Sequence, residues 1–106
     1  MYKVSLAIPI YNVSLFVERA LLSVLNQTYD NIEYLIVDDK GQDDSMDIVH
    51  RIIKDHPRGK DVRIIEHPYN IGLGATRNTA IDNAQGEYLF FMDSDDEIIP
   101  TCIEIL

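Results

Sequence analysis

Short apolar runs alternate with longer segments of helical periodicity along the whole chain, and this alternation restricts the fold more than any other property of the sequence. Four runs rich in β-branched and aromatic residues occupy positions 4–10, 32–37, 62–66 and 88–92. Strands separated by helices in this way pair in parallel through right-handed crossovers. Apolar strands without polar alternation fit a sheet that is covered on both faces. We therefore predict an α/β fold with three layers, α/β/α, and a mainly parallel sheet.

Three segments between these runs have apolar residues at helical spacing: 15–25, a segment that ends before His56, and 73–84. Ser14 is expected to cap the first helix, and Asp43 or Asp44 the second. Gly86 stands where a left-handed residue would end the third helix. Because no repeat, low-complexity stretch or linker interrupts the 106 residues, we expect a single domain over residues 1–106.

The charge balance and the few cysteines exclude several classes of function. Nine basic residues against eighteen acidic ones give a formal charge of -9, which argues against nucleic acid as a partner. The single cysteine allows no internal disulfide, and His50, His56 and His67 lack the spacing of metal ligands. The apolar runs are too short to span a bilayer, and the first residues show no signal peptide. We expect a cytoplasmic location, or one at the inner face of the membrane.

Polar residues follow three of the four predicted strands. Tyr11 and Asn12 follow the first strand, Asp38 and Asp39 the second, and the acidic run 93–96 the fourth. In open α/β sheets, ligands bind outside the carboxyl ends of the strands, and parallel strands bring these ends to one edge. We therefore predict that the acids after the second and fourth strands face a shared crevice.

The acidic run places three carboxylates within four residues, at Asp93, Asp95 and Asp96. Close carboxylates repel one another unless a cation or a proton relieves the repulsion. Mg²⁺ and Mn²⁺ prefer oxygen ligands, and one or two carboxylates often bind them together with substrate phosphates. The sequence therefore favours a divalent metal site here. The alternative is an acidic turn that begins a short helix.

Two further polar positions also have structural alternatives. A carboxylate at Asp38 or Asp39 could accept hydrogen bonds from a nucleobase or a ribose, or it could bind backbone N–H groups of its own loop. A glycine-rich entry to the third helix would let Arg77 point its planar guanidinium at a diphosphate. Arg77 could instead face solvent and pair with Asp82 or Glu87.

Five motifs, in the expected order, resemble those of family 2 glycosyltransferases, which have the GT-A fold. They occupy residues 4–12, 22–29, 36–39, 70–78 and 86–96. The resemblance covers essentially the whole chain, and the five motifs together are specific although each alone is not. It implies the N-terminal, nucleotide-sugar-binding portion of such an enzyme, a partial GT-A domain with the strand order 3-2-1-4.

The resemblance also implies roles for individual residues. Asp39 would contact the base, usually uracil, and Arg77 would help to position the base or the diphosphate. Asp93 and Asp95, the two ends of a D-x-D motif, would bind Mn²⁺ or Mg²⁺, with Asp95 as the direct ligand. The residues assigned to the nucleotide sugar are Pro9, Tyr11, Asn12, Asp38, Asp39, Arg77, Asn78 and Ser94.

The reaction implied by the resemblance is an inverting transfer. An acceptor hydroxyl would displace the nucleoside diphosphate of a UDP-sugar in one step, while the metal offsets the charge of the leaving group. The acceptor of the full-length protein would be a glycan or a lipid-linked molecule, as in the biosynthesis of cell-envelope polysaccharides. The family's general base lies after the D-x-D motif and would fall beyond residue 106. We therefore expect this chain to bind donor and metal without efficient transfer.

Lys40 and the strand at 88–92 set this chain apart from a complete member of the family. The family usually has a glycine after the paired aspartates, whereas Lys40 puts a side chain and a positive charge at that tight turn, which bears on the loop geometry and the choice of base. The strand at 88–92 would lie at an uncovered edge of the sheet with no gatekeeping charge inside it. We expect self-association through that edge or the neighbouring apolar surface.

Three other classes of protein share parts of this pattern. Receiver modules have a similar length, but their acidic pair follows the first strand, where this chain has Tyr11 and Asn12. Nucleotidyltransferases usually show a glycine-rich, basic loop at the same place, and this chain has neither glycine nor a basic residue there. A module that binds nucleotide and metal without transferring a sugar is compatible with the sequence.

Overall fold

The computed structural model describes residues 2–93, 98 and 100–105, and it confirms the predicted alternation of strands and helices. Strands and helices follow one another from the first strand to the fourth, and a short helix ends the described chain. The elements are β1 (Val4–Ile10), α1 (Val17–Leu25), β2 (Ile32–Asp38), α2 (Ser45–Asp55), η1 (Gly59–Asp61), β3 (Val62–Glu66), α3 (Leu73–Asn83), β4 (Tyr88–Phe91) and α4 (Cys102–Ile105).

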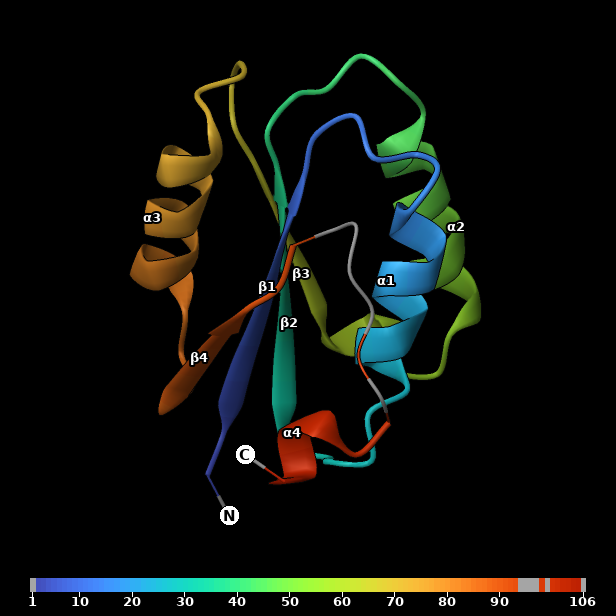
Figure 1. The fold of residues 1–106 in the computed structure, drawn as a ribbon, viewed down its shortest axis with the longest axis vertical. Helices are drawn as coiled ribbons and strands as arrows, with labels where there is room; N and C mark the ends of the chain where they lie inside the picture. Colours follow the sequence, from blue (N-terminus) through green and yellow to red (C-terminus); the bar gives the residue numbers. More distant parts are fainter. Residues whose placement is uncertain (1, 94–97, 99, 106) are drawn as a thin grey trace.

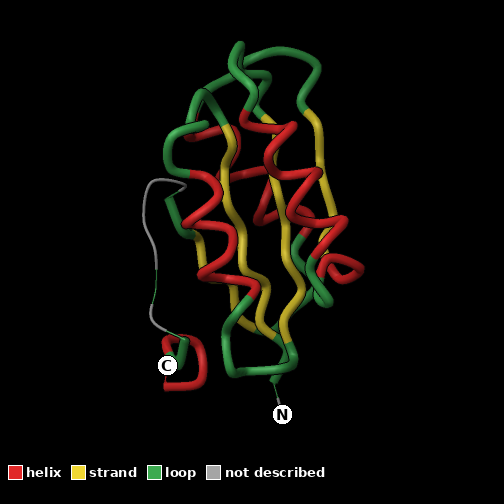
Figure 2. The backbone as a smooth tube through the Cα atoms, turned by 90° about the vertical axis from the view of Figure 1, so that its right-hand side faces the viewer, coloured by secondary structure: helices red, strands yellow, loops and turns green. Residues whose placement is uncertain are grey.

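The four strands form one parallel sheet in the order β3-β2-β1-β4, which confirms the order 3-2-1-4. Figure 1 shows α3 on one side of this sheet and α1 and α2 on the other, so the three layers are confirmed as well. In Figure 2, which is turned by 90°, α1 and α2 lie in front of the strands. The loops after β1, β2 and β3 gather at one end of the molecule.

The two faces of the sheet are packed differently. The larger core cluster joins Leu6, Ile8 and Ile36 to α1 and α2, which bury one apolar stripe each. The smaller cluster joins Ala7 and neighbouring β2 residues to Ala80 of α3. Successive strand residues point to opposite faces, so β1 turns its larger side chains toward α1 and α2 and its alanine toward α3. Within the described residues, no helix is long and apolar enough to cross a membrane.

The predicted cap of the first helix is wrong. α1 begins at Val17 with Phe16 in the N-cap position, and no side chain caps it. Ser14 instead donates its backbone N–H to Asp43 Oδ2 at 3.0 Å. Asp43 does stabilise the start of α2, because its other oxygen accepts the N–H of Ser45 at 3.0 Å, although the N-cap position itself belongs to Asp44. The Asp43 carboxylate, which comes from the segment before α2, therefore holds the backbone at Ser14, and the Ser14 side chain does not cap the helix as expected.

The predicted role of Gly86 is also wrong. α3 ends at Asn83, and the following residue, Ala84, is extended rather than left-handed. Gly72 is the glycine with positive φ among the described residues. Gly86 is needed for another reason, because a Cβ there would lie 2.7 Å from the backbone nitrogen of Ser5. The glycine therefore allows a close approach of two backbones where the chain enters β4.

β4 is an edge strand of the sheet, as predicted. Its first two residues are largely exposed, Tyr88 by 58% and Leu89 by 38%. The Tyr88 ring makes an edge-to-face contact with Tyr2, with ring centroids 5.5 Å apart. An apolar edge is therefore present in the described structure, and the self-association expected from it stays a prediction.

Candidate functional site

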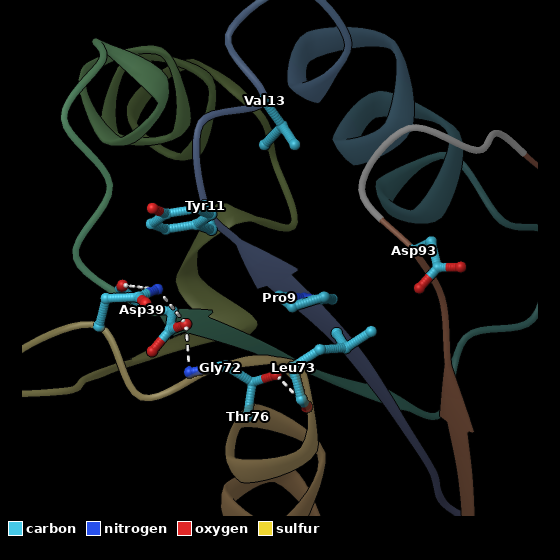
Figure 3. Close-up of a pocket in the computed structure, with 9 residues that line it drawn as sticks. Pro9, Tyr11, Val13, Asp39, Gly72, Leu73, Thr76 and Asp93 are labelled. Atoms are coloured by element: carbon cyan, nitrogen blue, oxygen red, sulfur yellow. Dashed lines mark hydrogen bonds between the residues drawn. The ribbon is translucent and has the colours of Figure 1, made fainter.

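The carboxyl ends of the strands enclose a hollow of about 440 Å³, which is the candidate site (Figure 3). Its walls come from the ends of β1, β2 and β4, from the loop after β3 and from the first turn of α3. The lining residues are Pro9, Tyr11, Val13, Asp39, Asn70, Gly72, Leu73, Thr76 and Asp93. Asp39 and Asp93 thus share one crevice, which confirms the spatial prediction made from the strand ends. In Figure 3 they lie on either side of Pro9.

Pro9 and Tyr11 reach the hollow because β1 extends beyond the last residue that pairs with β4. That pairing ends at Ala7, whose carbonyl accepts the N–H of Met92 at 2.9 Å. Backbone groups of alternate β1 residues face the same neighbouring strand, so Pro9 stands where the next N–H toward β4 would donate to the Met92 carbonyl. Proline has no N–H to donate, so the ladder between β1 and β4 stops after the bond from Met92 to Ala7. Tyr11, 45% exposed, follows at the mouth of the hollow.

Asp39 is almost completely buried, and its carboxylate accepts four hydrogen bonds. Oδ1 accepts the His67 Nδ1 hydrogen at 2.8 Å and the backbone N–H of Ile71 at 3.0 Å. Oδ2 accepts from Asn70 Nδ2 at 2.7 Å and from the backbone N–H of Gly72 at 3.1 Å. Burial alone would raise the pKa of Asp39, but these bonds outweigh it and lower the pKa below its ordinary value. The residue is therefore a fixed anion.

The loop from His67 to Gly72 is consequently tied to the end of β2, and it leads directly into α3. Gly72 occupies the N-cap position of α3 with φ of 96°, a conformation that favours glycine. Gly72, Leu73 and Thr76 bring the first turn of α3 to the wall of the hollow. The partial positive charge of a helix N-terminus favours an anion at this place.

Asn12 and Asp38 do not line the hollow but build the loop behind it. Asn12 has a φ of 52°, and its Oδ1 accepts the N–H of Gln42 at 2.7 Å. Asp38 Oδ1 accepts the N–H of Lys40 at 2.9 Å. Lys40 adopts a φ of 55°, a left-handed conformation in a residue other than glycine. Gly41 is required, since a Cβ there would lie 2.6 Å from Asn12 Oδ1.

Arg77 and Asn78 lie on α3 outside the lining of the hollow. The Arg77 guanidinium carbon stands 5.0 Å from the ring centroid of Phe91, a cation–π contact between α3 and β4. The predicted binding residues Ser94 and Asp95 lie outside the described residues. In the part of the chain that is described, no three His, Cys, Asp or Glu side chains are grouped as metal ligands. Asp93 is the member of the predicted metal pair that the structure places at the hollow.

His67 and Asn70 bind the Asp39 carboxylate and so help to build the site, which the sequence pattern did not reveal. The sequence shows of His67 only that it lacks the spacing of a metal ligand, and the structure shows it buried against Asp39. Asn70 belonged to a recognised motif but had no role assigned to it. His67 and Asn70 lie 28 and 31 positions away from Asp39 along the chain, so no local sequence pattern could have connected them with it.

Curated relatives of this chain are glycosyltransferases. The chain is 44% identical over 101 residues to the putative glycosyltransferase EpsH of Bacillus subtilis, with 95% of this chain and 28% of the relative covered. It is 31% identical over 106 residues to the GalNAc(5)-diNAcBac-PP-undecaprenol beta-1,3-glucosyltransferase of Campylobacter jejuni, with 100% of this chain and 34% of the relative covered. The chain therefore spans about a third of the length of these relatives.

Solved structures with the same arrangement bind nucleotide sugars. S. aureus TarS in complex with UDP-GlcNAc matches with a TM-score of 0.87 at 28% identity, covering 97% of this chain and 29% of that chain. The mannosyltransferase PcManGT of Pyrobaculum calidifontis, in complex with GDP-Man and Mn²⁺, matches with a TM-score of 0.84 at 26% identity, covering 91% of this chain and 28% of that chain. The fold of the chain is thus the N-terminal portion of the GT-A fold.

The sequence model described as "Glycosyl transferase family 2" matches residues 5–106, which is nearly the whole chain. The match agrees with the parallel sheet, with the nucleotide-sugar-binding neighbours and with the placement of Asp39 and Asp93 at one hollow. The chain belongs to glycosyl transferase family 2.

Proposed function

We infer that this chain binds a nucleoside-diphosphate sugar, and specifically a UDP-sugar, in the hollow at the carboxyl ends of the strands. The observation that carries the proposal is the shared hollow of Asp39 and Asp93, with Pro9 and Tyr11 between their strands. Nucleotide sugars bound to similar structures, UDP-GlcNAc and GDP-Man, support the class of ligand. The preference for uridine follows from the family resemblance.

The base belongs at the end of the hollow formed by Tyr11 and Asp39. The exposed Tyr11 ring offers a flat apolar surface for stacking, and Asp39 is an anion that can accept an N–H. All four acceptor positions of this carboxylate are already used, so an arriving N–H must share or displace one donor. Asn70 is the donor that can yield, because its side chain is exposed and lines the hollow, whereas His67 is buried.

The diphosphate belongs between the first turn of α3 and Asp93. Asp93 presents an exposed carboxylate at the wall of the hollow, a ligand type that suits Mg²⁺ or Mn²⁺ together with phosphate oxygens. Asp95 would complete the pair according to the family resemblance. Lewis-acid stabilisation of the departing diphosphate is the chemistry that a bound Mn²⁺ or Mg²⁺ supplies. The chain's own contribution is to hold the donor with its sugar facing out of the hollow.

The complete protein would transfer the sugar with inversion to an acceptor hydroxyl. We place the general base and most acceptor contacts in residues other than these 106, in keeping with the chain's share of about a third of its relatives. The Campylobacter jejuni relative is named for an undecaprenol-linked acceptor, which supports a glycan or lipid-linked acceptor here. The chain alone is then a donor-binding and metal-binding unit without efficient turnover.

Calorimetry with UDP, in the presence and absence of Mn²⁺, tests this proposal. UDP should bind only with the metal, and Asp93→Ala and Asp95→Ala should each weaken binding by about tenfold or more, as loss of a charge-bearing ligand does. Asp47→Ala, an exposed acid on α2, is the matched control and should bind as the unaltered chain does. GDP and ADP should bind more weakly than UDP.

Two results would contradict different parts of the proposal. Equal affinity for UDP, GDP and ADP would remove the uridine preference and leave the donor-site assignment. Absence of binding to any nucleoside diphosphate in the presence of Mn²⁺ would remove the donor-site assignment itself.

A further inference from the structure

We propose that His67 is a positioning residue for donor binding, which orients the Asp39 carboxylate by donating its Nδ1 hydrogen to Oδ1. The inference rests on the proposed function, since it concerns how tightly the same hollow holds a nucleotide. His67 does not line the hollow, and its side chain is 6% exposed. It acts from behind Asp39, on the side away from the ligand.

His67 connects the end of β2, the loop after β3 and α3. Its backbone N–H donates to the carbonyl of Asp38 at 2.9 Å, its Nδ1 lies 2.8 Å from Asp39 Oδ1, and its Nε2 lies 2.8 Å from Thr79 Oγ1. The ring therefore links the end of β2 and the loop after β3 to the second turn of α3. Both ring nitrogens have a partner, so the ring plane is fixed.

The positions of the hydrogens follow from counting donors. Asp39 is ionised at neutral pH and can only accept, so Nδ1 must carry a hydrogen. Thr79 has one hydroxyl hydrogen, and its Oγ1 lies 2.9 Å from the Ala75 carbonyl as well as 2.8 Å from Nε2. If that hydrogen points at Nε2, the ring is neutral. If it points at Ala75, Nε2 carries a second hydrogen. The Nδ1–H donor to Asp39 is common to both states.

The two oxygens of Asp39 have different surroundings. Asn70 and Gly72, which donate to Oδ2, both line the hollow. His67 and the Ile71 N–H, which donate to Oδ1, do not line it. Oδ2 is therefore the oxygen within reach of a nucleotide, and Oδ1 is the anchor. When a ligand displaces the Asn70 amide from Oδ2, the His67 bond keeps the carboxylate plane in place. This lowers the entropy that is lost on binding.

His56 provides a contrast within the same chain. Its Nδ1 accepts the N–H of Arg58 at 3.0 Å, and its Nε2 lies 2.8 Å from Asn26 Oδ1. An N–H donor at Nδ1 requires a lone pair there, so His56 carries its hydrogen on Nε2. His56 is thus as well bonded as His67 but carries no hydrogen on Nδ1, and its partners lie outside the hollow.

A pair of near-isosteric substitutions separates positioning from simple packing. The asparagine amide nitrogen can stand where Nδ1 stands, whereas the glutamine amide reaches the position of Nε2. His67→Gln should lose the bond to Asp39 and weaken metal-dependent UDP binding about tenfold, whereas His67→Asn should restore most of the affinity. His56→Gln is the control and should bind UDP as the unaltered chain does. Thermal unfolding of each variant shows whether affinity merely follows stability.

Ring-nitrogen NMR supplies a second readout that does not depend on a variant. The His67 Nδ1 signal should be that of a protonated nitrogen and should shift when UDP and the diamagnetic ion Mg²⁺ are added, while the His56 ring signals should not move. Equal loss of affinity in His67→Asn and His67→Gln, or unchanged affinity in His67→Gln, would overturn the positioning role. If the unaltered chain itself fails to bind any nucleoside diphosphate, the proposed function has failed first, and the two failures are thereby distinguished.

Discussion

Lys40 lies in the loop between β2 and α2 in a backbone conformation that residues with a Cβ rarely adopt. Its φ of 55° is left-handed, which costs about 1 kcal/mol or more for a residue other than glycine. The ion pair of its Nζ with Glu66, at 3.1 Å, is largely exposed to solvent and offsets little of this cost.

Substitution at Lys40 should therefore reveal stored strain. Lys40→Gly should be more stable than Lys40→Ala by about 1 kcal/mol, because both lose the ion pair but only the glycine relieves the left-handed backbone. For a chain of this size that difference is a shift of about 4–8 °C in Tm, measurable by thermal denaturation. Equal stability of the two variants would show that the loop is not strained at this residue.

The residues at the ends of the strands were predictable, and those that support them were not. Asp39 and Asp93 were found because a parallel sheet brings the acids after β2 and β4 to one edge. The support of Asp39 by His67 depends on side chains that meet only after the sheet has formed. The contact of Arg77 with the Phe91 ring could not be predicted either, because it joins two elements and neither element has a sequence pattern that indicates it.

The strands and most helix ends were predicted to within one residue, whereas the start of α1 and the roles of Ser14 and Gly86 were not. A buried parallel strand is a continuous apolar run, and its bounds can be read directly from the sequence. A helix end depends on which group satisfies its first N–H groups, and the partner can come from another loop. Asp43, which holds both Ser14 and Ser45, is such a partner, and α1 consequently starts at Val17 without a side-chain cap.

The exposed edge at β4 leads to a prediction about association. Parallel edge strands with apolar side chains and no charge are templates for pairing with another chain, and β4 has Tyr88 and Leu89 exposed with no charged residue from 88 to 91. Sedimentation should show concentration-dependent self-association of the chain. Leu89→Lys should shift it toward the monomer, whereas Ile81→Lys, at a more exposed apolar site on α3, should not. A monomeric profile at high concentration would contradict the prediction.

The periodicity of the sequence alone did not predict the strand order of the sheet. Alternating strands and helices predict a parallel sheet, but they do not state on which side of β1 each later strand is added. The family resemblance supplied the order 3-2-1-4, which the sheet confirms. The close approach of Gly86 to Ser5 could not be predicted from the sequence, because it exists only when β4 lies beside β1.

Three carboxylates hold distant parts of the molecule together in their ionised form. Glu33 accepts the Ser5 hydroxyl and the N–H of Gln85, both at 2.6 Å, and so joins β1, β2 and the entry to β4. Burial would raise the pKa values of Glu33, Asp39 and Asp43, but the hydrogen bonds they accept lower all three below their ordinary values. Each therefore stabilises the folded state above its unfolded pKa and loses that contribution as the pH falls toward its folded pKa.

The free energy of unfolding should accordingly fall as the pH is lowered from about 5 through 4, the range in which free Glu and Asp begin to take up protons. The formal charge of -9 acts in the opposite direction, because protonation of exposed acids relieves repulsion. Glu33→Gln separates the two effects: urea denaturation at several pH values should show a flatter acid dependence than in the unaltered chain. Glu18→Gln, in an exposed ion pair with Arg51, should leave the dependence unchanged. Stability that rises on acidification in all three proteins would mean that charge repulsion dominates and that the buried carboxylate bonds contribute little.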